Sequence, residues 1–242
     1  MIDFHCHVLP AMDDGAKDLT VSLRMLKAAG DQGIRRMIAT PHFYAEEEGP
    51  YDFLTRRKKA YHELTQTLAI VKEKNSDVFM PEIFLGAEIL FFPGMYGADE
   101  LYELRMADTG CILIEPPMVP WTDGMLDEIV RTGKALNLKP IIAHVDRFMR
   151  FLDDRNLMDR VMERDLLVQV NASYFLHRDW QEEAMEHLSE GHIDFIGSDC
   201  HDTNERRQNM GPARDAAAAA GLKKQFDTLM TSAEAYLGRE KI

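Results

Sequence analysis

Short apolar runs recur along the chain and alternate with longer segments in which apolar residues return every three or four positions. The short runs are typical of buried strands, and the longer segments are typical of amphipathic helices. Regular alternation of the two predicts parallel strands joined by right-handed crossovers. The seven apolar runs are Met1–His7, Arg36–His42, Ile83–Glu88, Cys111–Glu115, Pro140–His144, Leu166–Asn171 and Ile193–His201.

Helices are expected between these runs. Asp18 precedes the first helical segment and is a suitable N-cap, because its carboxylate can accept a hydrogen bond from a backbone N–H of the first turn. Val145–Arg147 is expected to extend the fifth strand. The expected helices lie near residues 19–30, 51–74, 98–104, 123–137, 155–164 and 180–189, and over the alanine-rich C-terminal remainder.

The chain of 242 residues contains no internal repeat, low-complexity tract or linker, so we expect one domain over residues 1–242. Seven strands in this pattern predict an α/β fold, a distorted seven-stranded (β/α)7 barrel that resembles a TIM barrel with one strand fewer. A doubly wound open sheet is the alternative, but it would spread the strand ends along a line. In a barrel the C-terminal strand ends meet on one face, where active sites are built.

Side chains that bind metal ions stand at the ends of the apolar runs. His5 and His7 are two positions apart on a strand, so their imidazoles point to the same side and can share an ion. Later runs end in further histidines and carboxylates. Nine candidates exceed the donors that one ion uses, which implies a cluster of two or three ions. The candidate metal ligands are His5, His7, Asp14, His42, Glu88, Glu115, His144, Asp199 and His201.

The composition narrows the classes of partner. Lys and Arg number 28 against 41 Asp and Glu, which gives a net charge of −13, and the basic residues form no long block. Binding to a nucleic-acid backbone or to an anionic membrane surface is therefore disfavoured. Three scattered cysteines do not form a disulfide framework, and no run approaches the roughly 20 apolar residues of a membrane helix. Without a secretory signal pattern, a soluble cytoplasmic protein is expected.

The motifs His-x-His, Asp-Asp-Gly, Pro-His, Gly-x-Glu, Ile-Glu-Pro-Pro, Ala-His-x-x-Arg and Ser-Asp-x-His occur in this order from Ile2 to about Arg206. In this combination the chain resembles the polymerase and histidinol phosphatase (PHP) superfamily. It is most similar to the manganese-dependent tyrosine phosphatases encoded with bacterial capsule and exopolysaccharide operons. Where many relatives have Gly-His-Pro-Glu-Arg, this chain has Ala-His144-Val-Asp-Arg147, which keeps the ligand and the arginine but changes the loop around them.

The resemblance implies a distorted seven-stranded barrel with three divalent metal ions, expected to be manganese, with iron or zinc as alternatives. It also implies a partner, the phosphotyrosine tail of a bacterial tyrosine kinase that governs polysaccharide export. By this resemblance a first metal takes His5, His7, Glu88 and Asp199, a second shares Glu88 and adds Glu115 and His144, and a third takes Asp14, His42 and His201.

The chemistry of such a cluster suits a phosphate ester. Three divalent cations would bring six positive charges against four candidate carboxylates, so the barrel mouth would attract a phosphate dianion. Arg147 and Arg206 would hold its oxygens and stabilise the transition state. Metal ions can lower the pKa of bound water to about 7, which supplies hydroxide for attack at phosphorus. A tyrosyl leaving group, with a pKa near 10, needs little acid, although His42 or His201 could donate a proton.

Other interpretations remain open. Histidinol-phosphate phosphatase is the alternative within the superfamily, an amidohydrolase is one from another reaction class, and a noncatalytic metal-binding relative is a third. Cys200 to Arg206 also matches the Cys-x5-Arg pattern of cysteine-dependent tyrosine phosphatases. We do not expect Cys200 to be the nucleophile, because such a loop presents backbone N–H groups to phosphate, whereas this one lacks glycine and contains Asp202 and Glu205.

Residues outside the proposed ligand set have simpler expected roles. Asn171 and Ser173 follow the sixth run and could line the pocket, or could make ordinary loop hydrogen bonds. The remaining histidines are expected at the surface or in helix packing, and they are His62, His177, His187 and His192.

Overall fold

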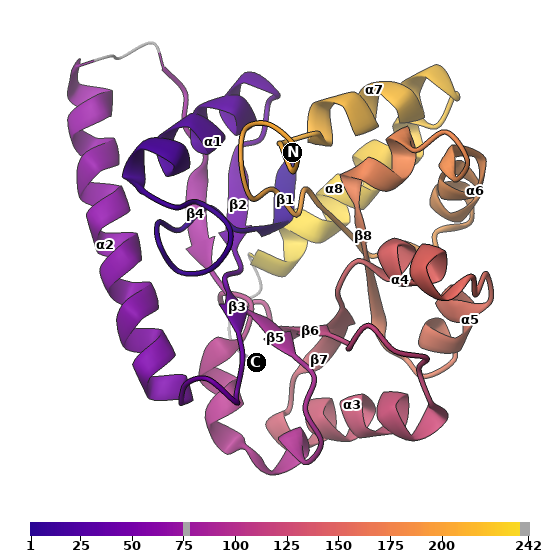
Figure 1. The fold of residues 1–242 in the computed structure, drawn as a ribbon. Helices are drawn as coiled ribbons and strands as arrows, with labels where there is room; N and C mark the ends of the chain where they lie inside the picture. Colours follow the sequence, from indigo (N-terminus) through magenta and orange to yellow (C-terminus); the bar gives the residue numbers. More distant parts are fainter. Residues whose placement is uncertain (75–77, 238–242) are drawn as a thin grey trace.

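The computed structural model describes residues 1–74 and 78–237 as an α/β fold in which parallel strands curl around a common centre and helices cover the outside (Figure 1). Within these residues the strands are β1 (Ile2–Cys6), β2 (Arg36–Ala39), β3 (His42–Phe43), β4 (Glu82–Leu85), β5 (Glu88–Leu90), β6 (Cys111–Glu115), β7 (Lys139–Ile142), β8 (Leu167–Asn171) and β9 (Phe195–Gly197). The α-helices are α1 (Leu19–Asp31), α2 (Pro50–Lys74), α3 (Asp123–Leu136), α4 (Val145–Leu152), α5 (Leu157–Met162), α6 (Gln181–Glu190), α7 (Met210–Ala219) and α8 (Lys223–Leu237). Three short 3-10 helices are η1 (Met95–Gly97), η2 (Asp99–Leu104) and η3 (Ala172–Leu176).

The strands form two parallel sheets, of order β1-β2-β4 and β3-β5-β6-β7-β8-β9. Backbone hydrogen bonds connect β1 with the segment that follows β9. The N–H of Asp199 donates to the carbonyl of His5 at 2.8 Å, and the N–H of His7 donates to the carbonyl of Cys200 at 3.0 Å. The first and last strands therefore lie side by side, and their C-terminal ends open on the same face.

Two of the seven apolar runs are each divided into two strands, so the predicted count of seven is not confirmed. β3 follows β2 after two residues, and β5 follows β4 after two residues. The first break contains Pro41, which has no N–H to donate to a strand ladder. Pairing resumes beyond it, where the N–H of Glu88 donates to the carbonyl of Pro41 at 3.1 Å. His42 and Glu88 then stand directly opposite each other in the β3–β5 register.

Burial explains why the strands read as continuous apolar runs. Every residue of β1 and of β6 is buried, as expected for parallel strands covered on both faces. Phe4 of β1 stacks on Phe195 of β9 with ring centroids 4.2 Å apart. Outside the sheet, α1 begins at the predicted cap, where the Asp18 carboxylate accepts from the Val21 N–H at 2.9 Å.

The prediction that Val145–Arg147 extends the fifth strand is wrong, because these residues begin helix α4. His144 adopts a left-handed backbone with φ 31°, which turns the chain out of the strand direction. The apolar residue that suggested strand, Val145, is buried with Phe148 and Met149 on one side of the new helix. The helix expected over 155–164 is present as the shorter α5. Among residues 1–74 and 78–237, no helix has the length and apolar character needed to cross a bilayer.

Candidate metal centre

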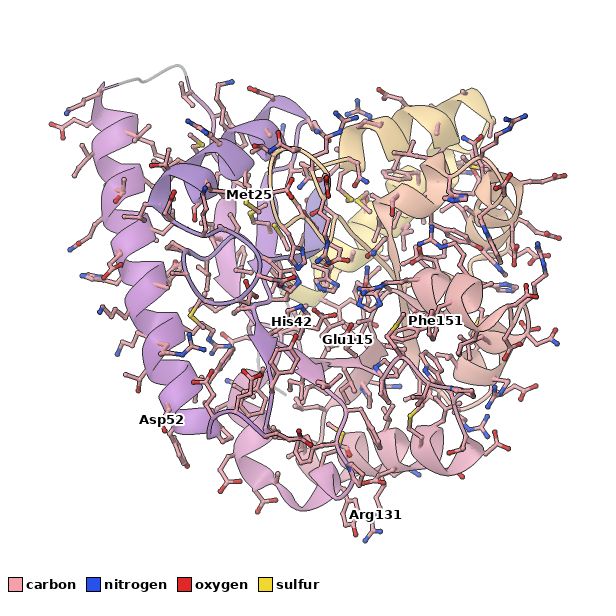
Figure 2. All side chains as sticks on the ribbon, viewed as in Figure 1. Met25, His42, Asp52, Glu115, Arg131 and Phe151 are labelled. Carbon is pink, nitrogen blue, oxygen red and sulfur yellow. The ribbon has the colours of Figure 1, made fainter. Side chains whose placement is uncertain are left out.

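The nine predicted ligand residues lie at the ends of the apolar runs or in the loops that follow them, and the structure brings them together. We call this set the nine-residue centre. Figure 2 shows two of them, His42 and Glu115, near the middle of the molecule, whereas Asp52 and Arg131 point outward at its edge. Six strands contribute. Four of them, β1, β6, β7 and β9, deliver ligands at or just past their C-terminal ends, whereas His42 and Glu88 are the first residues of the short strands β3 and β5. The loop after β1 supplies Asp14.

Glu88 is the hub of the centre. Its Oε2 lies 3.1 Å from His5 Nε2, 3.2 Å from His7 Nε2 and 3.1 Å from His42 Nδ1. Its Oε1 lies 2.9 Å from His144 Nε2. The Glu88 side chain is fully buried. One carboxylate surrounded by four imidazoles is the arrangement expected of a group that bridges cations.

The remaining ligand residues extend the centre in two directions. Toward α4, Glu115 Oε1 lies 3.3 Å from His144 Nε2. Toward solvent, His201 Nε2 lies 3.2 Å from Asp14 Oδ1. Ligand atoms within 4.8 Å of one another form three overlapping groups, namely His5 with His7 and Asp199, His7 with Asp14, His42 and His201, and His42 with Glu88 and Glu115.

Several buried polar atoms of the centre have no hydrogen-bond partner. These include Glu88 Oε2, His42 Nδ1 and His201 Nε2. Buried polar atoms are nearly always satisfied, so atoms left without a partner call for a further group between them. Imidazole nitrogens and carboxylate oxygens are the donors that divalent transition metals bind. The residues present therefore fit a cluster of metal ions.

The charges of the centre are strongly coupled. Burial alone would raise the pKa of Glu88, but the charge of His5 and the hydrogen bond from His144 outweigh burial and hold that pKa well below its usual range. Burial alone would lower the pKa of His144, yet Glu115 and Glu88 raise it to about 10. Carboxylates that hold protons this firmly on imidazoles also attract divalent cations, which compete with protons for the same nitrogens.

Two residues that the sequence did not single out orient the ligands. The Asp13 carboxylate accepts hydrogen bonds from His7 Nδ1 at 2.8 Å and from the His42 N–H at 2.9 Å. Gln169 Oε1 accepts from His5 Nδ1 at 3.1 Å and from the His144 N–H at 2.7 Å. The contacts to the Nδ1 atoms of His7 and His5 leave the Nε2 atoms of these rings facing the centre, and the two backbone contacts position His42 and His144. The available signals were the second aspartate beside Asp14 and a glutamine inside an apolar strand.

The backbone around the ligands is unusual at specific positions. His144 and Asp199 both have left-handed backbones, with φ 31° and φ 51°. Such conformations in residues other than glycine cluster at functional sites, where the surrounding structure compensates for the strain. A Cβ at Gly197 would lie 2.4 Å from the Cβ of His5, and a Cβ at Gly15 would lie 2.4 Å from the carbonyl oxygen of His7. These two glycines therefore allow close packing behind the first two ligands.

Arg147 and Arg206 stand at the edge of the centre, where they were predicted. Arg206 Nη2 contacts both carboxylate oxygens of Asp199 at 3.0 Å, and its Nη1 lies 3.3 Å from Asp14 Oδ2. Arg147 Nη1 lies 3.9 Å from Glu115 Oε1. Both arginine side chains are more than one third exposed, so a ligand in solvent can reach them.

The loop from Cys200 to Arg206 is not arranged as a phosphate cradle. The backbone N–H groups of His201 and Asp202 both face the carbonyl of Arg206, at 2.9 Å and 3.4 Å. The N–H of Asn204 donates to the Asp202 side chain. The Cys200 thiol is buried and donates to the Asp202 carbonyl at 3.2 Å. These contacts support the expectation that Cys200 is not the nucleophile.

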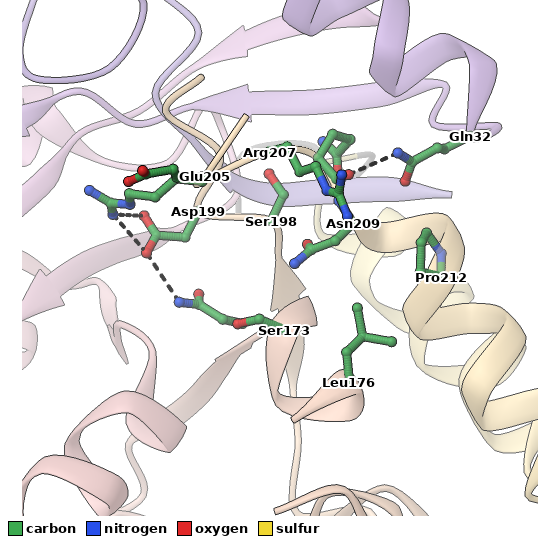
Figure 3. Close-up of a pocket in the computed structure, with 12 residues that line it drawn as sticks. Gln32, Ser173, Leu176, Ser198, Asp199, Glu205, Arg207, Asn209 and Pro212 are labelled. Carbon is green, nitrogen blue, oxygen red and sulfur yellow. Dashed lines mark hydrogen bonds and ion pairs between the residues drawn. The ribbon is translucent and has the colours of Figure 1, made fainter. Parts of the chain in front are cut away.

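A cavity of about 490 Å³ adjoins the centre on the side of Asp199. Figure 3 shows Asp199 at one end and Leu176 and Pro212 at the other, with Ser173 between them. The predicted lining residues Asn171 and Ser173 both belong to its wall. Asn171 Nδ2 also donates to Asp199 Oδ2 at 3.1 Å, so it orients a ligand as well.

The other four histidines lie outside the centre. His62 and His177 are exposed, as predicted. His187 and His192 are partly buried and lie beside each other, with their Nδ1 atoms 3.2 Å apart. No motif in the sequence indicated this pairing.

Comparison with known proteins agrees with the geometry. The family model described as capsular polysaccharide synthesis, CpsB/CapC, matches residues 1–237. The chain is 31% identical to the tyrosine-protein phosphatase YwqE of Bacillus subtilis over 220 residues, covering 85% of this chain and 79% of the relative. It is 25% identical to the tyrosine-protein phosphatase CpsB of Streptococcus pneumoniae over 243 residues, covering 93% of each.

Solved structures give the same result. Crystal structures of YwqE from Bacillus subtilis and CpsB from Streptococcus pneumoniae, described as unique metal-dependent tyrosine phosphatases, include a chain that superposes with a TM-score of 0.84 at 27% identity. That match covers 100% of this chain and 96% of the other. A lactonase from Listeria monocytogenes, Lmo2620, superposes with a TM-score of 0.53 at 13% identity, over 100% of this chain and 95% of the other, which reflects the fold alone. The resemblance inferred from the motifs is confirmed, and the chain belongs to the CpsB/CapC family of capsular polysaccharide synthesis proteins.

Proposed function

We propose that this protein is a metal-dependent tyrosine-protein phosphatase that hydrolyses phosphotyrosine in proteins and regulates capsule or exopolysaccharide synthesis. The observation that carries the proposal is the nine-residue centre, with Arg147 and Arg206 at its open edge. The relatives YwqE and CpsB are named tyrosine-protein phosphatases, which supports this reading over a histidinol-phosphate phosphatase or an amidohydrolase.

The centre would hold three divalent cations, which we propose to be manganese. His5, His7, Glu88 and Asp199 would form one donor group, and Glu115 and His144 would form a second that shares Glu88 with the first. The third group is Asp14, His42 and His201. When bound, divalent cations supply Lewis acidity, which activates water as a nucleophile and neutralises phosphoryl oxygens.

The two arginines would bind the phosphoryl group. Guanidinium groups form paired hydrogen bonds with phosphate oxygens and remain charged at every physiological pH. Arg206 is already held in place by Asp199 and Asp14, so its orientation is fixed before substrate arrives. Arg147 lies in the first turn of α4, three residues after the ligand His144. A phosphoryl group bound between the two arginines would therefore face positive charge from two sides of the open edge of the centre.

Proton donation to the leaving group is proposed for His42 rather than for His201. His201 Nδ1 faces the Asp199 carbonyl at 2.9 Å, which places its proton there, and its Nε2 points at Asp14. The Nδ1 of His201 is therefore taken by a hydrogen bond, and its Nε2 would serve as the metal ligand. His42 points Nδ1 at Glu88 and has Nε2 3.6 Å from Asp14, so Nε2 is the less constrained nitrogen. A tyrosyl leaving group, with a phenol pKa near 10, places little demand on this donor.

Two finer points complete the proposal. The pairs β2/β3 and β4/β5 would each act as one barrel position, which gives a distorted seven-position barrel. The substrate would be the phosphotyrosine tail of a bacterial tyrosine kinase, because an extended tail can enter the cavity beside Asp199 that Figure 3 shows.

The substrate class is tested by comparing kcat/KM for a phosphotyrosine peptide and for histidinol phosphate, with manganese present. A clear preference for the peptide is expected. A preference for histidinol phosphate would be consistent with the metal centre but would overturn the assignment as a tyrosine phosphatase. If neither substrate is hydrolysed, the proposed phosphatase activity is wrong and the centre only binds metal.

A further inference from the structure

A second group of metal-binding side chains lies on helix α6 and the turn after it. Among the described residues, His187, Glu190 and His192 are the group of three such side chains found outside the nine-residue centre, and we call them the α6 cluster. They stand before the start of β9, whereas Asp199 follows its end. The two sites are therefore at opposite ends of that strand, and Figure 1 shows α6 on the outer side of the fold.

The turn that ends α6 brings the two imidazoles together. Gly191 adopts φ 77°, a left-handed conformation that glycine accepts without strain, and its N–H donates to the His187 carbonyl. The N–H of His192 donates to the same carbonyl at 3.0 Å. The chain thereby folds back over the last helical turn and places the His192 ring beside the His187 ring.

The distances within the α6 cluster suit a tetrahedral ion. His187 Nδ1 and His192 Nδ1 are 3.2 Å apart, and His192 Nδ1 is 3.3 Å from Glu190 Oε2. A tetrahedral zinc ion with ligand bonds of 2.0–2.1 Å separates its ligand atoms by about 3.3 Å. The His5 and His7 nitrogens in the nine-residue centre are similarly spaced, at 3.1 Å.

The surroundings of His187 also favour a free electron pair on Nδ1. Its Nε2 is buried without a hydrogen-bond partner and lies 3.8 Å from Glu183 Oε1. The hydroxyl of Tyr174, whose ring stacks near that of His187, is likewise buried and without a partner. Arg155 holds the other Glu183 oxygen in place. A proton on Nε2, directed toward Glu183, leaves Nδ1 deprotonated and facing His192, which is how carboxylates orient metal-binding histidines.

We propose that His187, Glu190 and His192 bind one transition-metal ion, such as Zn²⁺, at a site separate from the nine-residue centre. Two imidazole nitrogens and one carboxylate oxygen form a set that zinc commonly uses, with a fourth position open to solvent. Because the ligands come from α6 and from the start of the β9 segment, the ion would fasten the helix end to the strand. The site does not depend on the proposed phosphatase activity.

The test is the zinc content per chain of the full-length protein, stripped with chelator and dialysed against Zn²⁺, measured by mass spectrometry. His192→Ala is expected to bind one zinc fewer than the wild type and to keep its phosphatase activity. His177→Ala, which removes an exposed histidine outside both sites, is the matched control and should bind as the wild type does.

A variant at an exposed position distinguishes loss of metal binding from misfolding. Glu190 is about half exposed, so Glu190→Gln is expected to fold normally and to weaken binding of this ion by about tenfold or more. Equal zinc content and affinity in wild type, His192→Ala and Glu190→Gln would overturn the proposal. So would equal losses in His192→Ala and His177→Ala, which would indicate nonspecific binding.

Discussion

The nine-residue centre and the α6 cluster use the same side-chain chemistry but are built differently. Six strands bring the centre together, and residues far apart in sequence, such as His5 and Gln169, hold its rings in place. The α6 cluster is local, since all three residues fall within six positions of one helix end. The nine-residue centre lies where parallel strands converge, and the α6 cluster lies at the opposite end of β9. Convergence of strand ends, and not the presence of histidines, is what concentrates many ligands in one place.

The difference extends to what supports each site. In the centre, buried carboxylates and left-handed backbones at His144 and Asp199 require the fold around them to compensate for strain and desolvation. In the α6 cluster, Glu190 is about half exposed, His192 is partly buried, and the turn relies on a glycine. We expect the centre to determine activity and the cluster to affect only local stability, and the following predictions test this contrast.

The largest effect is expected from Glu88→Gln. The substitution keeps the volume but removes the charge that four imidazoles surround. Because a bound metal contributes several kcal/mol to the transition state, kcat/KM for a phosphotyrosine peptide should fall by about 1,000-fold or more. Glu82→Gln, at an exposed position of the preceding strand, is the control and should retain activity. Full activity in Glu88→Gln would show that the Glu88 carboxylate is not required for the metal-dependent reaction.

Arg206→Lys is expected to have the next largest effect. Lysine keeps the charge but cannot reproduce the forked contact with Asp199, so kcat/KM should fall by about 100-fold. Arg214→Lys alters an arginine of nearly equal exposure on α7 and should change little. If both variants behave alike in steady-state kinetics, Arg206 has no part in binding the phosphoryl group.

Gln169→Met is expected to act through the ligands that it orients. Methionine has a similar length but no oxygen to accept from His5 Nδ1 and the His144 N–H. Loss of such a partner should weaken metal binding by about 10- to 100-fold, as measured by titration of metal-dependent activity. Excess manganese should restore part of kcat, a rescue that a misfolded protein would not show. Gln225→Met on the surface of α8 is the control.

The smallest effect is expected from changes at the α6 cluster. His192→Ala should leave kcat/KM for the phosphotyrosine peptide within about twofold of the wild type, because surface changes away from special features rarely alter a site elsewhere in a fold. A loss comparable to that of Gln169→Met would mean that the two regions are coupled, and the contrast between them would have to be abandoned.

Much of the centre could be predicted because the same pattern, a metal-binding residue at the end of an apolar run, recurs along the sequence. A histidine or carboxylate at the end of one apolar run carries little information, but the same event at successive run ends predicts a shared site. Asp18 as a helix cap was also predictable, since the signal is local. The amphipathic pattern predicted α3 within one residue of its observed end at Leu136.

What the sequence did not reveal depends on tertiary contacts. Gln169 is a polar residue in an apolar strand, and only the position of His5 on β1, beyond β9, gives it a role. The break at Pro41 could be seen in the sequence, but its effect on strand count could not, because pairing resumes at His42. The left-handed turn at His144 converted an expected strand extension into helix α4. The pairing of His187 with His192 required the helix cap at Gly191.

The most direct test of the central claim is hydrolysis of a phosphotyrosine peptide by manganese-loaded protein, chelator-treated protein and Cys200→Ser. The metal centre predicts that chelation abolishes turnover, that added manganese restores it, and that Cys200→Ser is as active as the wild type. The thiol of Cys200 is buried and directed at the Asp202 carbonyl, so its loss should not matter. Turnover that survives chelation but is lost in Cys200→Ser would contradict the account and make the Cys200 loop the catalytic site.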